Sequence, residues 1–286
     1  MHGMTYVLRY VCVLLWALLC ASAHAQLATL PRHSPYPGGV AIVKLSEADA
    51  PVLEVTFGGN RVLTLTLDEG LFGVVGIPLD AAPGMQQLQV NALKDGVRVV
   101  YTTAFEIKAK PKPYPTQHLR IDPRFLQLSP ENQARDDRDQ PLIAAAKTYW
   151  SDAPPVNFFL DLPAAGRLSA RFCLRRTLNG KEGSPHAGLD VAVGAGTPLR
   201  AAAAGRVIAV DDYFYSGKSV WLDYGQGFIT LYIHMSRIDV KAGDSVARGE
   251  VIGLSGASGR VTGPHLHWAV LLNGVYVDPE LFLKAR

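Results

Sequence analysis

Short segments that alternate apolar and polar residues run through most of this 286-residue chain, and they restrict it to a fold built mainly of strands. The segment 53–57 has this period of two, and 63–67 and 88–92 repeat it. Glycine-, asparagine- and aspartate-containing turn sequences separate the segments. About seven such strands between residues 38 and 108 predict a small immunoglobulin-like β-sandwich.

The first 25 residues predict a secretory signal peptide. Arg9 precedes an apolar run from Tyr10 to Cys20, and Ala23-His24-Ala25 supplies the small residues of a cleavage site. The run is much shorter than the ~20 residues that span a bilayer, so an uncleaved signal anchor is the weaker interpretation. We therefore predict an exported, periplasmic protein that is cleaved near Ala25/Gln26 and has no stable membrane anchor.

Three regions are expected after the leader. Residues 26–112 form the β-sandwich domain, 113–155 a helical connector, and 156–286 a second domain of antiparallel strands. Ser129 followed by Pro130 predicts a helix start in the connector, and Pro141 is expected to kink or divide that helix. The connector is also a candidate for an arm that covers a neighbouring groove.

Charge and cysteine content exclude several functions. The formal charge is +3, from 28 Lys+Arg against 25 Asp+Glu, which provides no general field for nucleic acid. Cleavage of the leader would leave Cys173 as the single cysteine, so no internal disulfide is possible. Cys173 lies in the apolar context Phe-Cys-Leu, which favours a small buried hydrophobe over the nucleophile of a Cys-His hydrolase.

Histidines concentrate in the last third of the chain. His186 and Asp190 stand four positions apart, and His265 and His267 are two positions apart in a strand-like run. Residues i and i+2 of a strand share a face, so both imidazoles can enter one groove. By the same rule, Tyr232 and His234 are predicted to share a face.

This set of residue types favours a zinc site. Two imidazoles and one carboxylate leave a fourth tetrahedral position for water, and zinc lowers the pKa of that water. A calcium cage would require more carboxylates, and no His-Glu-x-x-His motif is present to supply a glutamate base. Spacing alone does not decide which histidine of the 265/267 pair would bind the metal.

Three motifs resemble those of the lysostaphin-type (LytM-like) zinc metallopeptidases, which cut peptidoglycan peptides. They are His186-Ala-Gly-Leu-Asp190, Leu231-Tyr-Ile-His234 and Gly263-Pro-His-Leu-His267-Trp268. The resemblance covers roughly 157–282. It implies that His186, Asp190 and His267 bind Zn²⁺. It also implies that His265 and His234 flank the metal, as base and as oxyanion donor, while zinc-bound water attacks the peptide carbonyl.

The resemblance implies an exported zinc endopeptidase that cuts peptidoglycan cross-links between stem peptides, at D-Ala–diaminopimelate bonds, with glycine bridges as an alternative. A regulatory protein partner is a further expectation. The alternative function is a catalytically silent module on the same scaffold, which binds the wall or activates an amidase. Arg171, Arg175, Arg176 and Lys181 are candidates for contacting substrate carboxylates, with a plain surface cluster as the alternative. The segment 213–215 is either a groove wall or a solvated hairpin tip.

Overall fold

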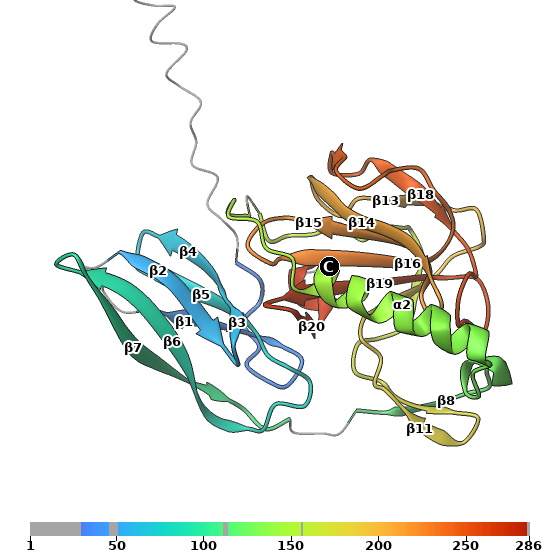
Figure 1. Cartoon of the computed structure of the whole chain (residues 1–286), viewed down its shortest axis with the longest axis horizontal. Coiled ribbons are helices and arrows are strands. Elements are labelled where there is room, and N and C mark those ends of the chain that lie inside the picture. Colours follow the sequence, from blue (N-terminus) through green and yellow to red (C-terminus); the bar gives the residue numbers. More distant parts are fainter. Residues whose placement is uncertain (1–29, 46–50, 111–113, 156, 285–286) are drawn as a thin grey trace, which may run out of the picture.

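The computed structural model describes residues 30–45, 51–110, 114–155 and 157–284 (Figure 1). The predicted signal peptide lies outside these residues. The first strands are β1 (Val40–Lys44), β2 (Val52–Phe57), β3 (Asn60–Arg61), β4 (Leu63–Leu67), β5 (Gly70–Gly76), β6 (Gly84–Lys94) and β7 (Val97–Ile107). The middle of the chain contains β8 (Thr116–Leu119), the 3₁₀ helix η1 (Pro123–Phe125) and the helix α2 (Pro130–Lys147).

The remaining elements belong to the second half of the chain. They are β9 (Arg167–Ala170), β10 (Arg175–Leu178), β11 (Lys181–Gly183), β12 (Leu189–Ala192), β13 (Pro198–Arg200), β14 (Gly205–Tyr213), β15 (Gly217–Asp223), β16 (Ile229–Ile238), β17 (Ser245–Val246), β18 (Val251–Ser255), β19 (Leu266–Leu272), β20 (Val275–Val277) and η2 (Pro279–Phe282). The expectation of a mostly β protein is confirmed.

Two antiparallel sheets form the N-terminal domain, on the left of Figure 1. One has the order β1-β5-β4 and the other β3-β2-β6-β7. Apolar side chains from both sheets meet in one core, because alternate residues such as Leu88 and Val90 on β6 point inward. The period-two pattern of the sequence is therefore the pattern of burial.

The sheet β1-β5-β4 also buries its other face, against the second domain. Val40, Leu63 and Val74 belong to the same apolar core as the C-terminal strands. At this contact the buried side-chain amide of Asn273 accepts a hydrogen bond from the Gly76 N–H (2.6 Å) and donates one to the Gly76 carbonyl (3.0 Å). The two domains thus share one core and a pair of buried polar contacts.

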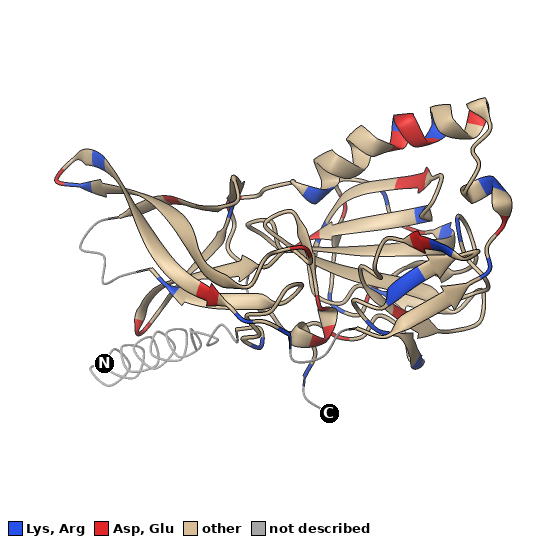
Figure 2. Ribbon diagram, turned by 90° about the horizontal axis from the view of Figure 1, so that it is seen from below, with Lys and Arg blue, Asp and Glu red and all other residues tan. Residues whose placement is uncertain are grey.

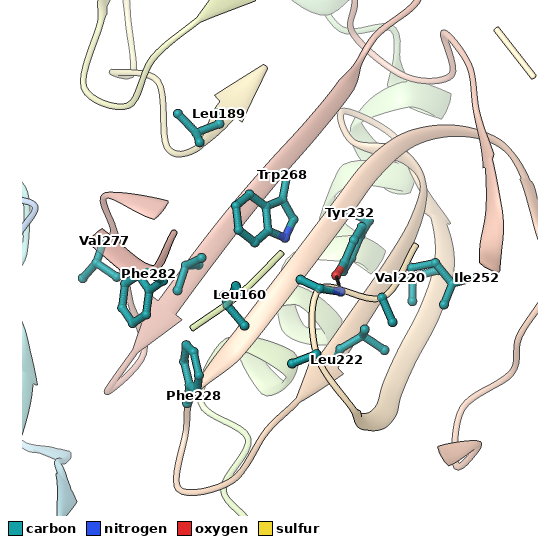
Figure 3. Close-up of a cluster of buried hydrophobic side chains, with 14 of the residues drawn as sticks. Leu160, Leu189, Val220, Leu222, Phe228, Tyr232, Ile252, Trp268, Val277 and Phe282 are labelled. Atoms are coloured by element: carbon teal, nitrogen blue, oxygen red, sulfur yellow. Dashed lines mark hydrogen bonds between the residues drawn. The ribbon is translucent and has the colours of Figure 1, made fainter. Parts of the chain in front are cut away.

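A sheet with the main order β17-β14-β15-β16-β19-β12-β9 dominates the C-terminal domain. One face packs on a core that contains Trp268, Tyr232 and Phe228, as Figure 3 shows. The Tyr232 hydroxyl accepts a hydrogen bond from the Ala202 N–H at 2.9 Å in this core. The opposite face carries a second apolar cluster, which includes Leu271. Successive apolar residues of β19 belong alternately to one cluster and the other.

Helix α2 covers part of this opposite face, where Ala146 packs into the second cluster (Figure 1). The helix begins as predicted, with the Ser129 hydroxyl accepting from the Asn132 N–H. It is not divided at Pro141, which contradicts one of the two expected outcomes. Pro141 lies on the solvent side of the helix. It has no N–H to offer the backbone carbonyl four residues earlier, and that carbonyl can bond to water instead.

The connector contributes to the C-terminal domain at two further places. Strand β8 pairs in parallel with β10 and extends the β10–β11 hairpin to a small sheet. Charged residues along α2 are visible in Figure 2, and one of them binds the end of β14: Arg135 donates to the Asp212 carboxylate at 3.2 Å. Buried Asp139 accepts hydrogen bonds from Arg138 and from the Phe214 N–H. Within the described ranges, no helix is both long and apolar enough to cross a bilayer.

We expect Asp139→Ala to lower the free energy of unfolding by about 2–3 kcal/mol, because it leaves the buried Phe214 N–H without an acceptor. Asp137→Ala on the same helix is the matched control, since Asp137 is exposed and should cost under about 0.5 kcal/mol. Urea unfolding monitored by tryptophan fluorescence measures both values. Equal losses in the two variants would contradict the assigned role of Asp139.

Candidate functional site

The pairing of β12 with β19 places Asp190 directly opposite His267. Their side chains project from the sheet face that lies away from the main core, on the same side of β19 as Leu271. Asp190 Oδ1 lies 2.8 Å from His267 Nδ1. One antiparallel register therefore brings a carboxylate and an imidazole into contact.

His186 completes the cluster from the loop before β12. Its Nδ1–H donates to the Arg171 carbonyl at 2.8 Å, so the lone pair is on Nε2. That Nε2 lies 2.9 Å from Asp190 Oδ1 and 2.9 Å from His267 Nδ1. Gly188 makes the approach possible, because a Cβ there would lie 2.7 Å from His267 Nε2 and 2.5 Å from the Trp268 carbonyl.

Two more histidines, His265 and His234, lie beside this cluster. His265 Nδ1–H donates to the Gly263 carbonyl at 2.8 Å, and its Nε2 lies 3.7 Å from Asp190 Oδ1. The ring centroids of His265 and His234 are 5.0 Å apart. All five predicted site residues thus lie together at one place in the fold.

His234 reaches the site through a distortion of β16, and the predicted sharing of a face by Tyr232 and His234 is wrong. The register of β15 with β16 shifts at this point, and His234 has φ +64°, which is unusual for a residue with a side chain. Tyr232 points into the main core, whereas His234 lines the groove. The bulge therefore moves His234 to the face that alternation assigns to its neighbours.

Contacts from distant segments hold His234 in this conformation. Its N–H donates to the Ser216 carbonyl at 3.0 Å, and its Nδ1–H donates to the Ser258 carbonyl at 2.8 Å. The Ser258 hydroxyl in turn donates to the Met235 carbonyl at 2.7 Å. Sequence analysis missed Ser258, which lies after β18 in a segment where Gly256, Gly259 and Gly263 favour a loop.

The environment keeps these side chains in the forms that bind metals. Burial lowers the pKa of His267 to about 4 despite its contact with Asp190. Burial, with repulsion from His267 and His265, lowers the pKa of His234 to about 3. Burial would raise the pKa of Asp190, but contacts with His186 and His267 outweigh it, so this pKa stays well below its usual range. At neutral pH His267 is therefore a neutral imidazole beside an ionised Asp190 carboxylate.

A groove of about 520 Å³ opens over the cluster. Strand β8 lines one side with Gln117 and Leu119, and β10 contributes Arg176. Tyr215 and the loop 260–264 also line it. The segment 213–215 was expected to be either a groove wall or a solvated hairpin tip. Tyr215 lines the groove, whereas Tyr213 is buried.

The candidate arginines have different surroundings. Arg176 donates to Asp190 Oδ2 at 3.2 Å, a contact that sequence analysis did not predict. Arg175, the next residue along β10, is exposed and pairs with Glu182 at 3.0 Å. Arg171 pairs with Glu280. Of these three, Arg176 alone lines the groove in the described part of the chain.

The donor set fits a tetrahedral metal ion. His186 Nε2, His267 Nδ1 and Asp190 Oδ1 converge from separate elements, and all three residues are buried. Two nitrogen donors and one oxygen donor are the composition of catalytic zinc sites that keep one position open. The hydrogen bond from His186 to a backbone carbonyl is the type of outer contact that orients a metal-binding imidazole.

Cys173 is not part of this chemistry. It is buried, and burial raises the pKa of its thiol to about 12, so it does not supply a thiolate at neutral pH. Its backbone N–H donates to the His186 carbonyl at 2.8 Å, and its φ is +67°. The interpretation of Cys173 as a small buried hydrophobe is the one that fits.

Comparison with known proteins identifies the family. The profile of "Peptidase family M23" matches residues 184–279, and that of "Peptidase family M23 N-terminal domain" matches 33–110. A crystal structure described as a peptidase M23 from Pseudomonas aeruginosa is 39% identical, with a TM-score of 0.71. The match covers 89% of this chain and 97% of that one.

The chain belongs to peptidase family M23. It is also similar to the peptidoglycan DD-endopeptidase ShyA of Vibrio cholerae, with 42% identity over 109 residues, 38% of this chain and 25% of ShyA. The DD-carboxypeptidase/endopeptidase Mpg of Neisseria meningitidis is 42% identical over 94 residues, 33% of this chain and 22% of Mpg. The matches span about a quarter of the length of these curated relatives.

We expect His186→Ala, Asp190→Ala and His267→Ala each to weaken zinc binding by at least about 100-fold, because the loss of an outer contact alone costs 10- to 100-fold. His118→Ala is the control, since His118 is exposed on β8 and outside the cluster. Native mass spectrometry after zinc loading measures the bound metal. Full zinc occupancy in any of the three variants would remove that residue from the ligand set.

In the metal-free M23 chain, we expect the free energy of unfolding to fall as the pH decreases from about 6.5 toward 4. The unfolded chain binds protons at the usual histidine pKa of 6.5, whereas His267 and His234 in the folded chain remain neutral until about 4 and 3. Chemical denaturation with a chelator present, at several pH values, tests this. His267→Gln should flatten the dependence, and an unchanged slope would contradict it.

Proposed function

We propose that this chain is a zinc-dependent endopeptidase that hydrolyses peptide cross-links of peptidoglycan. One observation carries the proposal: the three donor atoms of His186, Asp190 and His267 converge within 2.8–2.9 Å, at a groove that two further histidines line. Membership of peptidase family M23 supports hydrolysis of peptide bonds. The names of the similar proteins support peptidoglycan as the substrate.

In this proposal His186, Asp190 and His267 hold the zinc ion. When bound, zinc polarises the peptide carbonyl and acidifies a water molecule. The bond between Arg176 and Asp190 Oδ2 orients the carboxylate, so that its other oxygen, Oδ1, is presented to the metal.

His265 and His234 manage the protons. Each donates Nδ1–H to a backbone carbonyl, so in the neutral ring Nε2 is an acceptor. His265 Nε2 lies 3.7 Å from Asp190 Oδ1 and is the general base in this proposal. His234 is the oxyanion donor in this proposal only in its protonated form. Its low pKa leaves Nε2 unprotonated before the reaction, so Nε2 donates only after it has received a proton.

The cross-link between D-Ala and diaminopimelate is the proposed bond, and the periplasm is the proposed location. ShyA of Vibrio cholerae is named a DD-endopeptidase, which supports the bond type. The predicted signal peptide, residues 1–25, supports export.

We expect the zinc-loaded chain to convert cross-linked muropeptide dimers to monomers with a new amine, and a chelator to abolish the reaction. His265→Ala should lower kcat by about 10²- to 10⁴-fold with full zinc content, because it removes proton transfer and leaves the ligands intact. His118→Ala should cleave like the unaltered chain, since His118 does not line the groove.

Mass spectrometry of the digests identifies the bond and measures the rates. Absence of cleavage by a fully zinc-loaded chain would overturn the proposal and favour a catalytically silent module. Cleavage that persists in His265→Ala at the full rate would assign the base to another residue.

A further inference from the structure

Arg176 has a hydrogen-bonding group that the protein leaves unused. Its Nη2 donates to Asp190 Oδ2 at 3.2 Å, and the side chain is 22% exposed. Its Nε, however, is fully buried and has no acceptor among the described residues. An unmet buried donor destabilises the site, and a charged one does so more strongly. An acceptor that arrives with the substrate would satisfy it.

Arg260 brings a second guanidinium to the same groove. The backbone N–H of Arg260 donates to the Tyr215 carbonyl at 2.8 Å. The guanidinium carbon lies 4.6 Å from the centre of the Tyr215 ring. Stacking on this ring fixes the side chain. Asp190 is the one acidic residue among the described lining residues, and Asp136, outside the groove lining, also acts on the charge of Arg260. Arg176 and Arg260 both line this groove, so two guanidinium groups face the same space.

Gln117 adds a polar group next to Arg176. The two residues are opposite each other in the parallel β8–β10 register. Gln117 Oε1 is buried and unpartnered in the described chain, and the residue lines the groove. A buried acceptor beside a buried donor suits a ligand that presents both a carboxylate and an amide N–H.

The charge balance of the groove favours an anionic ligand. Arg176 and Arg260 supply two positive charges, and Asp190 supplies the single negative charge among the described lining residues. A guanidinium binds a carboxylate through parallel hydrogen bonds, which gives both affinity and orientation. In a D-Ala–diaminopimelate cross-link, the carbon attached to the scissile nitrogen bears such a free carboxylate.

We propose that Arg176 and Arg260 form a subsite that binds the carboxylate adjacent to the scissile amide and holds the carbonyl over the ligand cluster. The proposal rests on the proposed function, and it makes the two arginines specificity-determining residues. Gln117 Oε1 accepts the neighbouring amide N–H in this arrangement. A cross-link that lacks this carboxylate, such as a glycine bridge, leaves Arg176 Nε without its acceptor.

Binding to an inactive, zinc-loaded chain tests the subsite without turnover. The background is His265→Ala, and the probes are two cross-linked dimers, one with the free carboxylate and one with that carboxylate amidated. We expect isothermal titration calorimetry to show about 10- to 100-fold tighter binding of the free-carboxylate dimer, since charge-assisted hydrogen bonds are lost on amidation. Arg260→Ala in this background should reduce the preference to about 3-fold or less.

Arg176→Lys is the second variant, because lysine keeps the positive charge but cannot form the two parallel hydrogen bonds of a guanidinium. Its zinc content is measured in parallel, since Arg176 also contacts Asp190. Arg175→Ala is the matched control: it is the neighbour on β10, it is exposed, and it should keep the full preference.

Equal binding of the two dimers, or no binding of either, would overturn the subsite. Loss of the preference in Arg175→Ala would do the same. The outcome is separable from the proposed function: cleavage of both dimers without preference retains the endopeptidase and removes the subsite. An arginine-dependent preference without cleavage by the unaltered chain retains the subsite and removes the endopeptidase.

Discussion

The meeting of one carboxylate and two imidazoles at a buried point is the constraint on which this structure depends. Asp190 and His267 face each other because β12 and β19 pair in one register, and a slip of either strand by one residue would place the two side chains on opposite faces of the sheet. Trp268 and Leu266, on the other side of β19, fix that register through burial. The hydrophobic core therefore sets the position of the polar site, and Gly188 supplies the space it needs.

The most predictable parts are those that local spacing encodes. Alternation along 88–92 predicted the correct burial in β6, and it also predicted that His265 and His267 share a face. Their convergence with His186 and Asp190 was implied by the motif resemblance. The position of His234 was not predictable from spacing. Its left-handed backbone depends on carbonyls of Ser216 and Ser258, from segments that no local pattern links to β16. Alternation fails where tertiary contacts bend a strand.

The groove wall was unpredictable for a similar reason. Strand β8 lies in the segment expected to be a helical connector, and its partner β10 is far along the chain, so no local signal announces the pairing. The same pairing sets Gln117 beside Arg176. Arg176 was grouped with Arg171 and Arg175 by sequence, but alternation on a short strand separates it from Arg175. The polar side chains of this groove wall are thus brought together by the pairing of two distant segments.

The shared core between the domains has a consequence for motion. Val40, Leu63 and Val74 are packed with C-terminal residues, and Asn273 bonds Gly76 at the same contact. A rigid-body swing of the N-terminal domain would expose these groups together, so the two halves form one cooperative unit rather than a hinged pair. The groove lies on the sheet face opposite that core. The rim of the groove, at Tyr215 and the loop 260–264, is therefore separated from the sandwich by that core, and the sandwich acts as a fixed base.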